Sequence, residues 1–523
     1  MRSKFLRAMD MFTNERYFRF RLFGEGIIVG VFAGCVISLF RFLLEAGENI
    51  RPVIYSYIKS GGMLTVIGWL LATAGIAFII GKIVAYEPMC SGSGIPQIKG
   101  VLSGRMKMSW ARVIAAKLVG GVLAIGAGLS LGREGPSVQL GACTGQGISF
   151  LSKISRSEGR FLITAGSGAG LAAAFNAPLA GVIFCLEELT KNFSPLVLMA
   201  TIAASVTATT VSQLFFGGQP VFHIGEITPL PISQFGALIV LGVFVGIMGQ
   251  VFNKLLIVSL DSYDKSGLQG MCRPLVPLLC AVPLGFFLPQ IMGGGNRLVD
   301  ALVSIDHALP FLFVLLAGKL LFTMLSFGSG VPGGIFLPML VMGALSGAIF
   351  SKALVLAGII DAVWTVNFIV FGMAAYFASV VKSPVTGSVL IMEMTGSFHH
   401  MLPLIIVSIT AAMTAEIMGG EPVYEMLLDR SLKKNAENSE EVAHHRLVVE
   451  IIVGNNSELD GKTIAEVSWP DNTLIVNVRR GDAEYVPDGN LILKAEDYVY
   501  LYADDVNIEA VESMAMEGTR SAI

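Results

Sequence analysis

Gly132-Arg133-Glu134-Gly135-Pro136 lies between two long apolar runs, near residues 111–130 and 161–190. A proline in the first turn of a helix, with glycine before it, marks a helix start. The first turn presents unpaired N–H groups and the positive end of the helix dipole, which together attract anions. The stretch therefore predicts a helix that begins inside an apolar region and directs its N-terminus at an anion.

Two other stretches repeat this combination of glycine, proline and a neighbouring apolar run. They are GSGIP at residues 92–96 and GGIFLP at residues 333–338. Three helix N-termini that meet inside a membrane would hold an anion through backbone N–H groups, without a full cationic side chain. Such a site would release its anion more readily than a buried lysine would, and transport requires that release.

The composition requires lipid as the solvent for most of the chain. Of the 523 residues, 54% are hydrophobic and 14% are charged, whereas soluble domains carry about 25% charged residues. Apolar segments lie near residues 24–44, 63–85, 111–130, 161–190, 196–215, 235–258, 274–291, 310–326, 337–357, 366–380 and 402–418. Several are too short to cross about 30 Å of hydrocarbon as straight helices. We therefore expect an all-α polytopic membrane protein with broken helices, which in transporters mark the binding site.

The distribution of charge predicts a second, soluble domain. Residues 1–430 carry a net charge of +7, and residues 431–523 carry −10. This shift predicts a transmembrane domain at 1–430, a linker at 431–446 and a small domain at 447–523. The runs at 447–453, 474–478 and 491–501 are typical of strands, and residues 462–467 could form a short helix, so the small domain is expected to be α/β.

Basic residues before the first apolar segment predict the orientation of the chain. They are Arg2, Lys4, Arg7, Arg16, Arg19 and Arg21. Because positive charge accumulates on the cytoplasmic side, we expect a cytoplasmic N-terminus. Lys433 and Lys434 indicate the same side for the C-terminal domain. The first apolar run is too long for a signal peptide and is expected to be the first membrane helix.

The cysteines and histidines do not indicate a cofactor. The six cysteines lack the spacing of metal ligands or of a disulfide framework. The adjacent pairs His399–His400 and His444–His445 lack the spacing that places two ligands on one helix face. We therefore expect no metal and no cofactor.

A weak internal repeat relates the two halves of the membrane domain. GREGP at residue 132 and GIFLP at residue 334 share the frame G-x-x-x-P, and APLAG at residue 177 resembles SPVTG at residue 383. An apolar stretch and an acid follow in each copy, with Glu187 in the first and Glu393 in the second. The order and offsets favour duplicated halves. Chance matches between glycine-rich stretches are the alternative.

Taken together, these motifs resemble the signature sequences of the chloride channel/transporter (CLC) family. GSGIP, GREGP and GxFxP occur in the family's order, and so do AAAFNAPLAGVIFCLEEL at 172–189 and GGEPVY at 419–424. The likeness covers about residues 20–430. It implies two inverted-repeat halves, a homodimer in the lipid bilayer and one anion pathway in each subunit.

The resemblance also implies which residues contact the anion. Ser93 is similar to the serine whose hydroxyl contacts the central ion, and Tyr424 to the tyrosine that contacts it from the far side. Ile335 and Phe336 match residues that donate backbone N–H groups. By itself, Ser93 could instead be a turn-former that bonds its own backbone. Tyr424 could be an aromatic residue of the membrane interface.

Two acids match the family's proton-handling residues. Glu134 resembles the gating glutamate, whose carboxylate occupies the anion site when ionised and moves aside when protonated or displaced. Glu188 matches the internal glutamate that relays protons in the exchangers. Intramembrane carboxylates are costly and are usually functional. Glu134 could alternatively pair with Arg133, and Glu188 could mark a helix end in water. Glu187 and Glu393 are expected to be structural.

Some positions depart from the family or narrow its specificity. Gln97 follows GSGIP where the family often has glutamate, which puts local salt bridges in doubt. Ser93 suits chloride, since members that prefer nitrate tend to have proline there. The fluoride branch departs more broadly from GSGIP and GREGP, so fluoride is disfavoured.

The tail is similar to the TrkA-C (RCK C-terminal) module of ion-transport regulators. The resemblance rests on Glu458–Thr463, Val478–Arg480, Val486–Pro487 and Glu496–Asp497, and it covers about residues 447–503. It implies a ligand-sensing or dimer-coupling role, with an unidentified small ligand as a possible partner.

These observations predict a chloride/proton antiporter of the plasma (inner) membrane, gated by Glu134, that is not an enzyme and binds no nucleic acid. A passive voltage- or ligand-gated chloride channel is the nearest alternative, and Glu188 disfavours it because family channels usually lack an acid there. A membrane-embedded serine hydrolase with Ser93 as nucleophile would need a histidine base. No histidine occurs between Met1 and Pro220.

Overall fold

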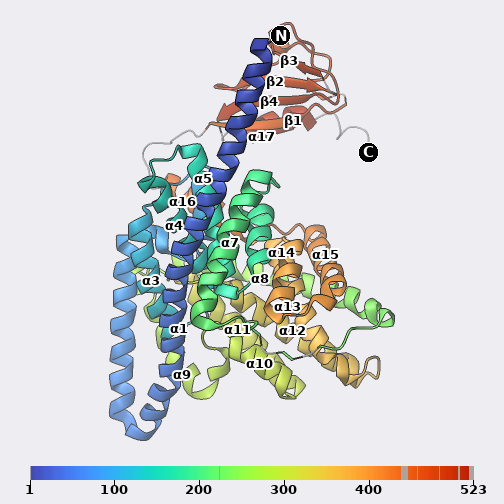
Figure 1. The fold of residues 1–523 in the computed structure, drawn as a ribbon. Coiled ribbons are helices and arrows are strands. Elements are labelled where there is room, and N and C mark those ends of the chain that lie inside the picture. Colours follow the sequence, from blue (N-terminus) through green and yellow to red (C-terminus); the bar gives the residue numbers. More distant parts are fainter. Residues whose placement is uncertain are drawn as a thin grey trace. The chain divides into compact units, whose positions relative to one another are not determined.

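The computed structural model describes residues 2–222, 224–225, 227–437, 446–455, 457–481, 483–504 and 507–516 (Figure 1). The chain forms two compact units, Met1–Asp429 and Arg430–Ile523. The linker expected at 431–446 falls partly outside the described residues. Within the described part of that range, helix α16 (Val423–Glu437) continues to Glu437 and strand β1 begins at Arg446.

The first unit is helical. Its other helices are α1 (Arg2–Tyr86), α2 (Ile95–Leu102), α3 (Trp110–Gly126), α4 (Glu134–Leu151), α5 (Arg156–Phe175), α6 (Pro178–Phe184), α7 (Pro195–Phe216), α8 (Phe235–Lys265), α9 (Leu275–Phe287), α10 (Asn296–Ser304), α11 (Leu309–Gly328), α12 (Phe336–Leu356), α13 (Thr365–Val381), α14 (Pro384–Thr395) and α15 (Met401–Ile417). Within the described residues, eight helical stretches are long and apolar enough to cross a membrane. Helices α2, α6 and α10 are much shorter, so the unit contains the broken helices that the sequence predicts.

Helix α1 consists of two membrane-crossing segments. Gly62 has φ 77°, a left-handed conformation that interrupts the helix between the apolar runs near 24–44 and 63–85. The long apolar run near 161–190 is also interrupted. Asn176 adopts φ 55° after α5, and Pro178 starts α6. Glycine, asparagine and proline therefore divide apolar sequence into separate helices.

Glycine pairs hold the same helices together in each half of the unit. A Cβ on Gly141 of α4 would collide with the carbonyl of Gly166 on α5. A Cβ on Gly343 of α12 would similarly collide with the carbonyl of Gly372 on α13. Small residues let membrane helices approach closely. The α4–α5 pair therefore corresponds to the α12–α13 pair, as duplicated halves require.

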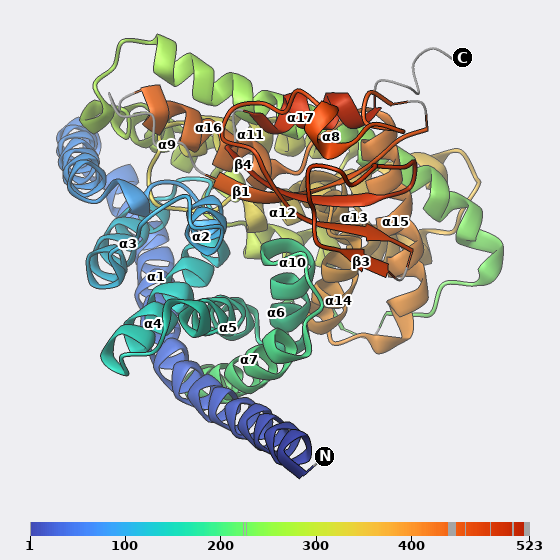
Figure 2. The ribbon, with the colours of Figure 1, turned by 90° about the horizontal axis from the view of Figure 1, so that it is seen from above.

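Helices α6 and α14 show that the halves are inverted. Glu187, just after α6, accepts hydrogen bonds from the N–H groups of Val385 (3.1 Å) and Thr386 (2.6 Å) at the start of α14. Glu393, near the end of α14, accepts from Leu179 (3.1 Å) and Ala180 (2.7 Å) at the start of α6. Each helix thus ends beside the beginning of the other, so the two run antiparallel. Figure 2 shows α6 beside α14, between the helices of the first half and those of the second.

The second unit contains a four-stranded antiparallel sheet of order β1-β4-β2-β3. Its strands are β1 (Arg446–Ile452), β2 (Leu474–Arg480), β3 (Ala483–Tyr485) and β4 (Tyr498–Asp504), and helix α17 (Ile508–Met516) follows. A small apolar core contains Ile451, Val478, Leu493, Val499, Leu501 and Val511. The sheet and helix confirm the expected α/β class.

Two expectations for this unit are wrong in detail. The strand expected at 491–501 begins only at Tyr498, because the chain first turns. Asp497 Oδ2 accepts from the N–H of Lys494 (2.9 Å), and Glu496 has φ 70°. The helix expected at 462–467 is a single 3₁₀ turn, Ile464–Glu466, which a capping box between Thr463 and Glu466 closes.

Candidate functional site

The three predicted helix starts meet at one place. The N–H of Gly132 donates to the carbonyl of Gly334 (2.7 Å), and the N–H of Gly334 donates back to Gly132 (2.8 Å). The N–H of Gly333 donates to the carbonyl of Gly92 (3.0 Å). The loops before α2, α4 and α12 are therefore tied together through backbone hydrogen bonds, which places the three N-termini around a common centre.

Glycine is required where these loops touch. Gly94, the N-cap of α2, has φ 91°, a backbone angle that residues other than glycine rarely adopt. A Cβ on Gly135 would lie 2.9 Å from the Cβ of Ser93. A Cβ on Gly132 would collide with the Glu134 carboxylate. The GSGIP and GREGP motifs thus supply the close backbone approach that the convergence needs.

Three of the four predicted anion-contact residues belong to the joined loops or the helix start beside them, and the fourth, Tyr424, is buried as they are. Ser93 is 2% exposed, and Ile335, Phe336 and Tyr424 are fully buried. The Phe336 ring packs against Phe175, with centroids 5.4 Å apart, and this contact holds the start of α12.

The hydroxyls of Tyr424 and Ser93 are placed differently. Among the described residues, the Tyr424 hydroxyl has no hydrogen-bond partner. Because Tyr424 is fully buried, it is not an aromatic residue of the membrane interface. Ser93 Oγ accepts from the N–H of Ile95 (3.3 Å), so it does form a local turn. That bond leaves the Ser93 O–H free to donate.

Glu134 is the first residue of α4 and is fully buried. Its carboxylate faces the backbone N–H groups of Glu134 itself and of Leu337 on α12. Neither oxygen makes a hydrogen bond of good geometry to any described residue. Arg133 does not pair with it, because its Nη1 lies 3.7 Å from Glu45 instead. A carboxylate directed at two helix N-termini occupies a position suited to an anion.

Glu188 is buried and belongs to an ion-pair chain. It accepts from Lys99 Nζ (2.8 Å) and from the Ser383 hydroxyl (2.9 Å). Lys99 also lies 3.5 Å from Glu425, and Glu425 contacts Lys191, whose side chain is 54% exposed. Glu188 is therefore not a helix end in water, and charged groups connect it to the surface.

Comparison with known proteins agrees with this geometry. The family model for voltage-gated chloride channels matches residues 75–416. The chain belongs to the CLC family. A TrkA-C domain model matches residues 448–515.

Similar CLC proteins are named as exchangers. The H(+)/Cl(−) exchange transporter ClcA of Vibrio cholerae is 35% identical over 82% of this chain and 93% of the relative. ClcA of Citrobacter koseri is 32% identical over 79% of this chain and 89% of the relative. These relatives are transporters rather than enzymes.

Solved structures show the same fold. The structure of a slow cyanobacterial Cl−/H+ antiporter aligns with a TM-score of 0.75 and 30% identity, over 79% of this chain and 98% of that protein. A eukaryotic CLC transporter aligns with a TM-score of 0.66 and 22% identity, over 79% of this chain and 74% of that protein, a likeness of fold alone.

Two buried lysines of this CLC protein bind the loops before α2 and α10, and the sequence reasoning missed them. Lys117 on α3 donates to the carbonyls of Cys90 (2.9 Å) and Gly92 (2.7 Å). Lys319 on α11 donates to the carbonyls of Ile291 (3.1 Å) and Gly293 (2.7 Å). Both are fully buried, and they occupy corresponding positions in the two halves. In the sequence, the feature that could have pointed to them is that each is a single lysine within an apolar run.

Lys99 was also missed. Lys99 lies on α2, the short helix that begins in the GSGIP motif. A charged residue on a helix that starts at the predicted anion site could have been recognised in the sequence as a candidate site residue. No group of three or more His, Cys, Asp or Glu side chains within the described ranges could hold a metal ion. His444 and His445 lie outside those ranges.

Proposed function

We propose that this CLC protein exchanges chloride for protons across a membrane. The observation that carries the proposal is the position of Glu134: its buried carboxylate faces the backbone N–H groups at the starts of α4 and α12, without a hydrogen bond of good geometry in the described chain. An unsatisfied buried polar group costs about 1–3 kcal/mol. An acid that alternately holds a proton and gives way to an anion would account for that arrangement. The exchange activity for which the similar proteins are named supports the same conclusion.

The gate would work by competition between two anions. When ionised, the Glu134 carboxylate occupies the position that the N-termini of α4 and α12 favour. A chloride ion would first bind to the hydroxyls of Ser93 and Tyr424 and to the N–H groups of Ile335 and Phe336. It would then displace the Glu134 carboxylate toward the side of the membrane opposite the one from which chloride came. Protonation removes its charge and its attraction to the helix ends, and so lets chloride pass. Each cycle thus links a proton to anion movement.

Protons would reach the gate from Glu188. Tyr424 lies within electrostatic range of both Glu188 and Glu134, which is compatible with a proton path past it. The pairing of Glu188 with Lys99 and onward to the exposed Lys191 gives a polar route between the buried acid and solvent. A passive channel would have no use for this acid, so the Glu188 cluster favours exchange over a channel.

A cavity of about 750 Å³ beside Lys99 would serve as the entrance for anions. Lys99, Arg105 and Arg160 line it, with Glu425 and Asp429 as the acids. These three cations and two acids leave a positive excess of one charge, and a positive potential attracts anions. Chloride would gather here beside the residues that lead to Glu188.

The remaining assignments follow from the sequence and the family. We propose that residues 1–430 form the transport domain and 447–523 a TrkA-C-like regulatory domain after a linker at 431–446. The protein would be a homodimer in the plasma (inner) membrane, with the N-terminus and the regulatory domain in the cytoplasm. A small ligand would bind the regulatory domain, and transport would need no cofactor. The serine-hydrolase alternative lacks support, since the Ser93 hydroxyl contacts backbone rather than a base.

The residue roles are tested by flux into liposomes that contain the full-length protein. We expect Glu134→Gln to abolish chloride-driven proton uptake while chloride still flows, because the amide imitates the protonated gate. We expect Glu188→Gln to abolish proton uptake as well, with chloride flux retained. Glu416→Gln, an exposed acid outside the site, is the matched control and should transport both ions. Normal proton uptake in Glu188→Gln would remove the proposed relay.

A further inference from the structure

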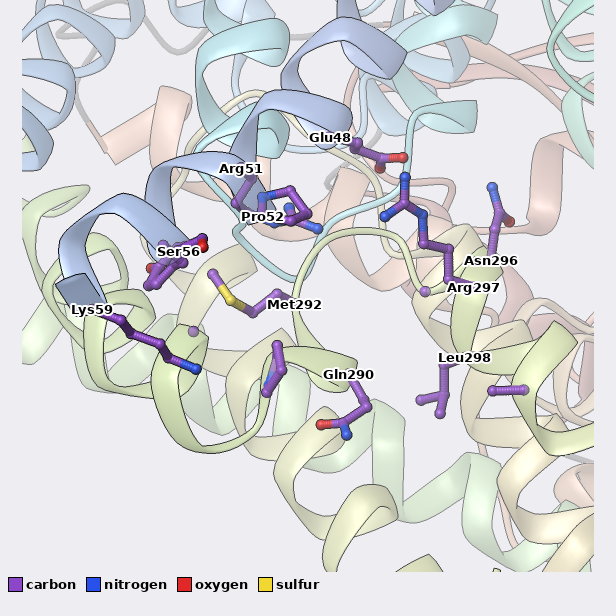
Figure 3. Close-up of a pocket in the computed structure, with 15 residues that line it drawn as sticks. Glu48, Arg51, Pro52, Ser56, Lys59, Gln290, Met292, Asn296, Arg297 and Leu298 are labelled. Atoms are coloured by element: carbon purple, nitrogen blue, oxygen red, sulfur yellow. The ribbon is translucent and has the colours of Figure 1, made fainter. Parts of the chain in front are cut away.

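A second cavity, of about 470 Å³, lies between α1, the residues before α10, and α10 itself (Figure 3). Three cationic side chains line it, Arg51, Lys59 and Arg297. Glu48 is the acidic residue among its lining residues. The lining therefore has a net charge of about +2, if each group carries its usual charge. None of these residues belongs to the proposed chloride path.

Arg51 is held in place but is not neutralised. A Cβ on Gly293 would lie 3.3 Å from Nη1 of Arg51 and 3.6 Å from Oε1 of Glu48, so the guanidinium rests on this glycine turn near a single acid. Arg51 Nη1 is buried and has no hydrogen-bond partner among the described residues. An unused, buried N–H donor of an arginine is costly. A ligand that accepts its hydrogen bond would relieve that cost.

Within the described residues, Arg297 uses one of its N–H donor nitrogens, which leaves the others for a ligand. Its Nη2 donates to the neutral side chain of Asn49 (2.7 Å), and Arg297 is the second residue of α10, after Asn296. Gly295, the N-cap with φ 103°, opens the first turn of α10 toward the same cavity. The Asn296 Oδ1 atom is buried and unpartnered within the described chain. Figure 3 shows the side chains of Arg51, Arg297 and Lys59 distributed around the cavity.

The chemistry of this lining fits an oxoanion better than a halide. Guanidinium groups present paired N–H donors that match the oxygen atoms of phosphate, with a defined geometry that a spherical ion does not need. The cavity is many times larger than a chloride ion. Ser56, Gln290 and Asn296 add neutral polar groups that suit a polyatomic ligand.

We propose that this cavity binds a phosphate group, either as free phosphate or as the headgroup of a phospholipid. The glycine turn beside the cavity is joined through its backbone to the loop before α4. The N–H of Gly293, on which Arg51 rests, donates to the carbonyl of Gly128 (3.0 Å), four residues before Gly132. The proposal concerns binding and stands whether or not the protein exchanges protons.

Equilibrium dialysis of the purified full-length protein against radiolabelled inorganic phosphate tests the first source. We expect saturable binding of one phosphate per subunit. Arg51→Gln and Arg297→Gln should each weaken it by about tenfold or more, since hydrogen bonds to charged groups are strong. Arg51→Lys keeps the charge but loses the fork and should weaken binding less. The control is Lys107→Gln, which removes an exposed cation outside the cavity and should bind like the unaltered protein. Thermal unfolding establishes that each variant is folded.

The phospholipid source is tested on the same preparations. Phospholipid phosphorus that remains after extensive detergent exchange is measured per subunit. If the headgroup fills the cavity, free phosphate does not bind, and the retained phosphorus falls in Arg51→Gln and Arg297→Gln but not in Lys107→Gln. Binding of neither form, or binding that the cavity variants leave unchanged, overturns the proposal.

Discussion

At the scale of single residues, Lys99 determines how Glu188 can act. Its Nζ lies 2.8 Å from Glu188, and both side chains are buried. Removal of one member of a buried ion pair costs about 3–5 kcal/mol, because the other is left uncompensated. Lys99 thus allows Glu188 to be charged inside the protein, and a relay must be able to lose its proton.

We therefore predict that Lys99→Gln reduces chloride-driven proton uptake by about tenfold or more, since 1.36 kcal/mol corresponds to one factor of ten. Chloride flux should fall less. Lys462→Gln, which removes an exposed ion pair with Glu458 outside the proposed proton route, is the matched control. Exposed ion pairs are worth about 0–1 kcal/mol, so proton uptake should change by less than about fivefold. Equal losses in the two variants would contradict this role of Lys99.

The sequence predicted the residues that belong to motifs and missed those that do not. Ser93, Glu134 and Phe336 belong to stretches whose glycines and prolines mark helix starts, and the structure places them together. Lys117 and Lys319 were missed because their partners are backbone carbonyls of distant loops. Carbonyls have no sequence signature, so a lone lysine in an apolar run does not identify them.

At the scale of elements, reciprocal caps tie α6 to α14. The N-terminal turns of both helices donate to a carboxylate from the opposite half, Glu187 or Glu393. Loss of a helix cap costs about 0.5–2 kcal/mol. We predict that Glu187→Ala and Glu393→Ala lower the free energy of unfolding by similar amounts of about this size, measured by denaturation in detergent. A loss confined to one of the two would contradict the symmetric arrangement.

The glycine contact between α4 and α5 gives a second prediction for elements. A Cβ on Gly141 would collide with the backbone of Gly166, whereas a Cβ on Gly75 of α1 would meet nothing within 4 Å. Overpacking costs about 1–3 kcal/mol. Gly141→Ala should therefore lower the melting temperature. Gly75→Ala should leave it unchanged or raise it, because alanine favours a helix by about 1 kcal/mol over glycine. Similar effects of both substitutions would show that the helices do not pack this closely.

Element boundaries were predictable where a residue type forces them. Gly62, with φ 77°, ends the first crossing of α1, and proline starts α6 and α14. The strand expected at 491–501 was wrong because a side chain, Asp497, bonds local backbone and imposes a turn in a β-rich run. Strand β3, at Ala483–Tyr485, is too short to show a pattern of alternation.

At the scale of the whole molecule, the C-terminal unit has its own core and its own buried charge. Arg480 donates to both carboxylate oxygens of Asp497 at 2.7 Å, and Asp497 is fully buried. These hydrogen bonds hold the pKa of Arg480 above its usual value. Because the pKa of Arg480 is raised in the folded state, the pair contributes its full stabilisation to this unit at neutral pH. That contribution is lost only in strong alkali, as Arg480 loses its proton.

We predict that Arg480→Gln unfolds or loosens this unit in the full-length protein, because Asp497 would be left buried and unpaired. Hydrogen exchange of peptides from β2 and β4 should quicken by about tenfold or more, whereas peptides from α4 and α12 keep their protection. Lys462→Gln removes an exposed ion pair with Glu458 and should change neither set. Unchanged exchange in Arg480→Gln would contradict a structural role for the pair.

The most direct test of chloride/proton exchange uses liposomes that contain the unaltered protein, with the membrane potential held at zero by potassium and valinomycin. A chloride gradient is the only driving force, and a pH electrode follows protons in the external solution. We predict that protons move against their own gradient while chloride runs down, and that an imposed proton gradient drives chloride uphill in return. Chloride movement without any proton movement would contradict the account and make the protein a channel.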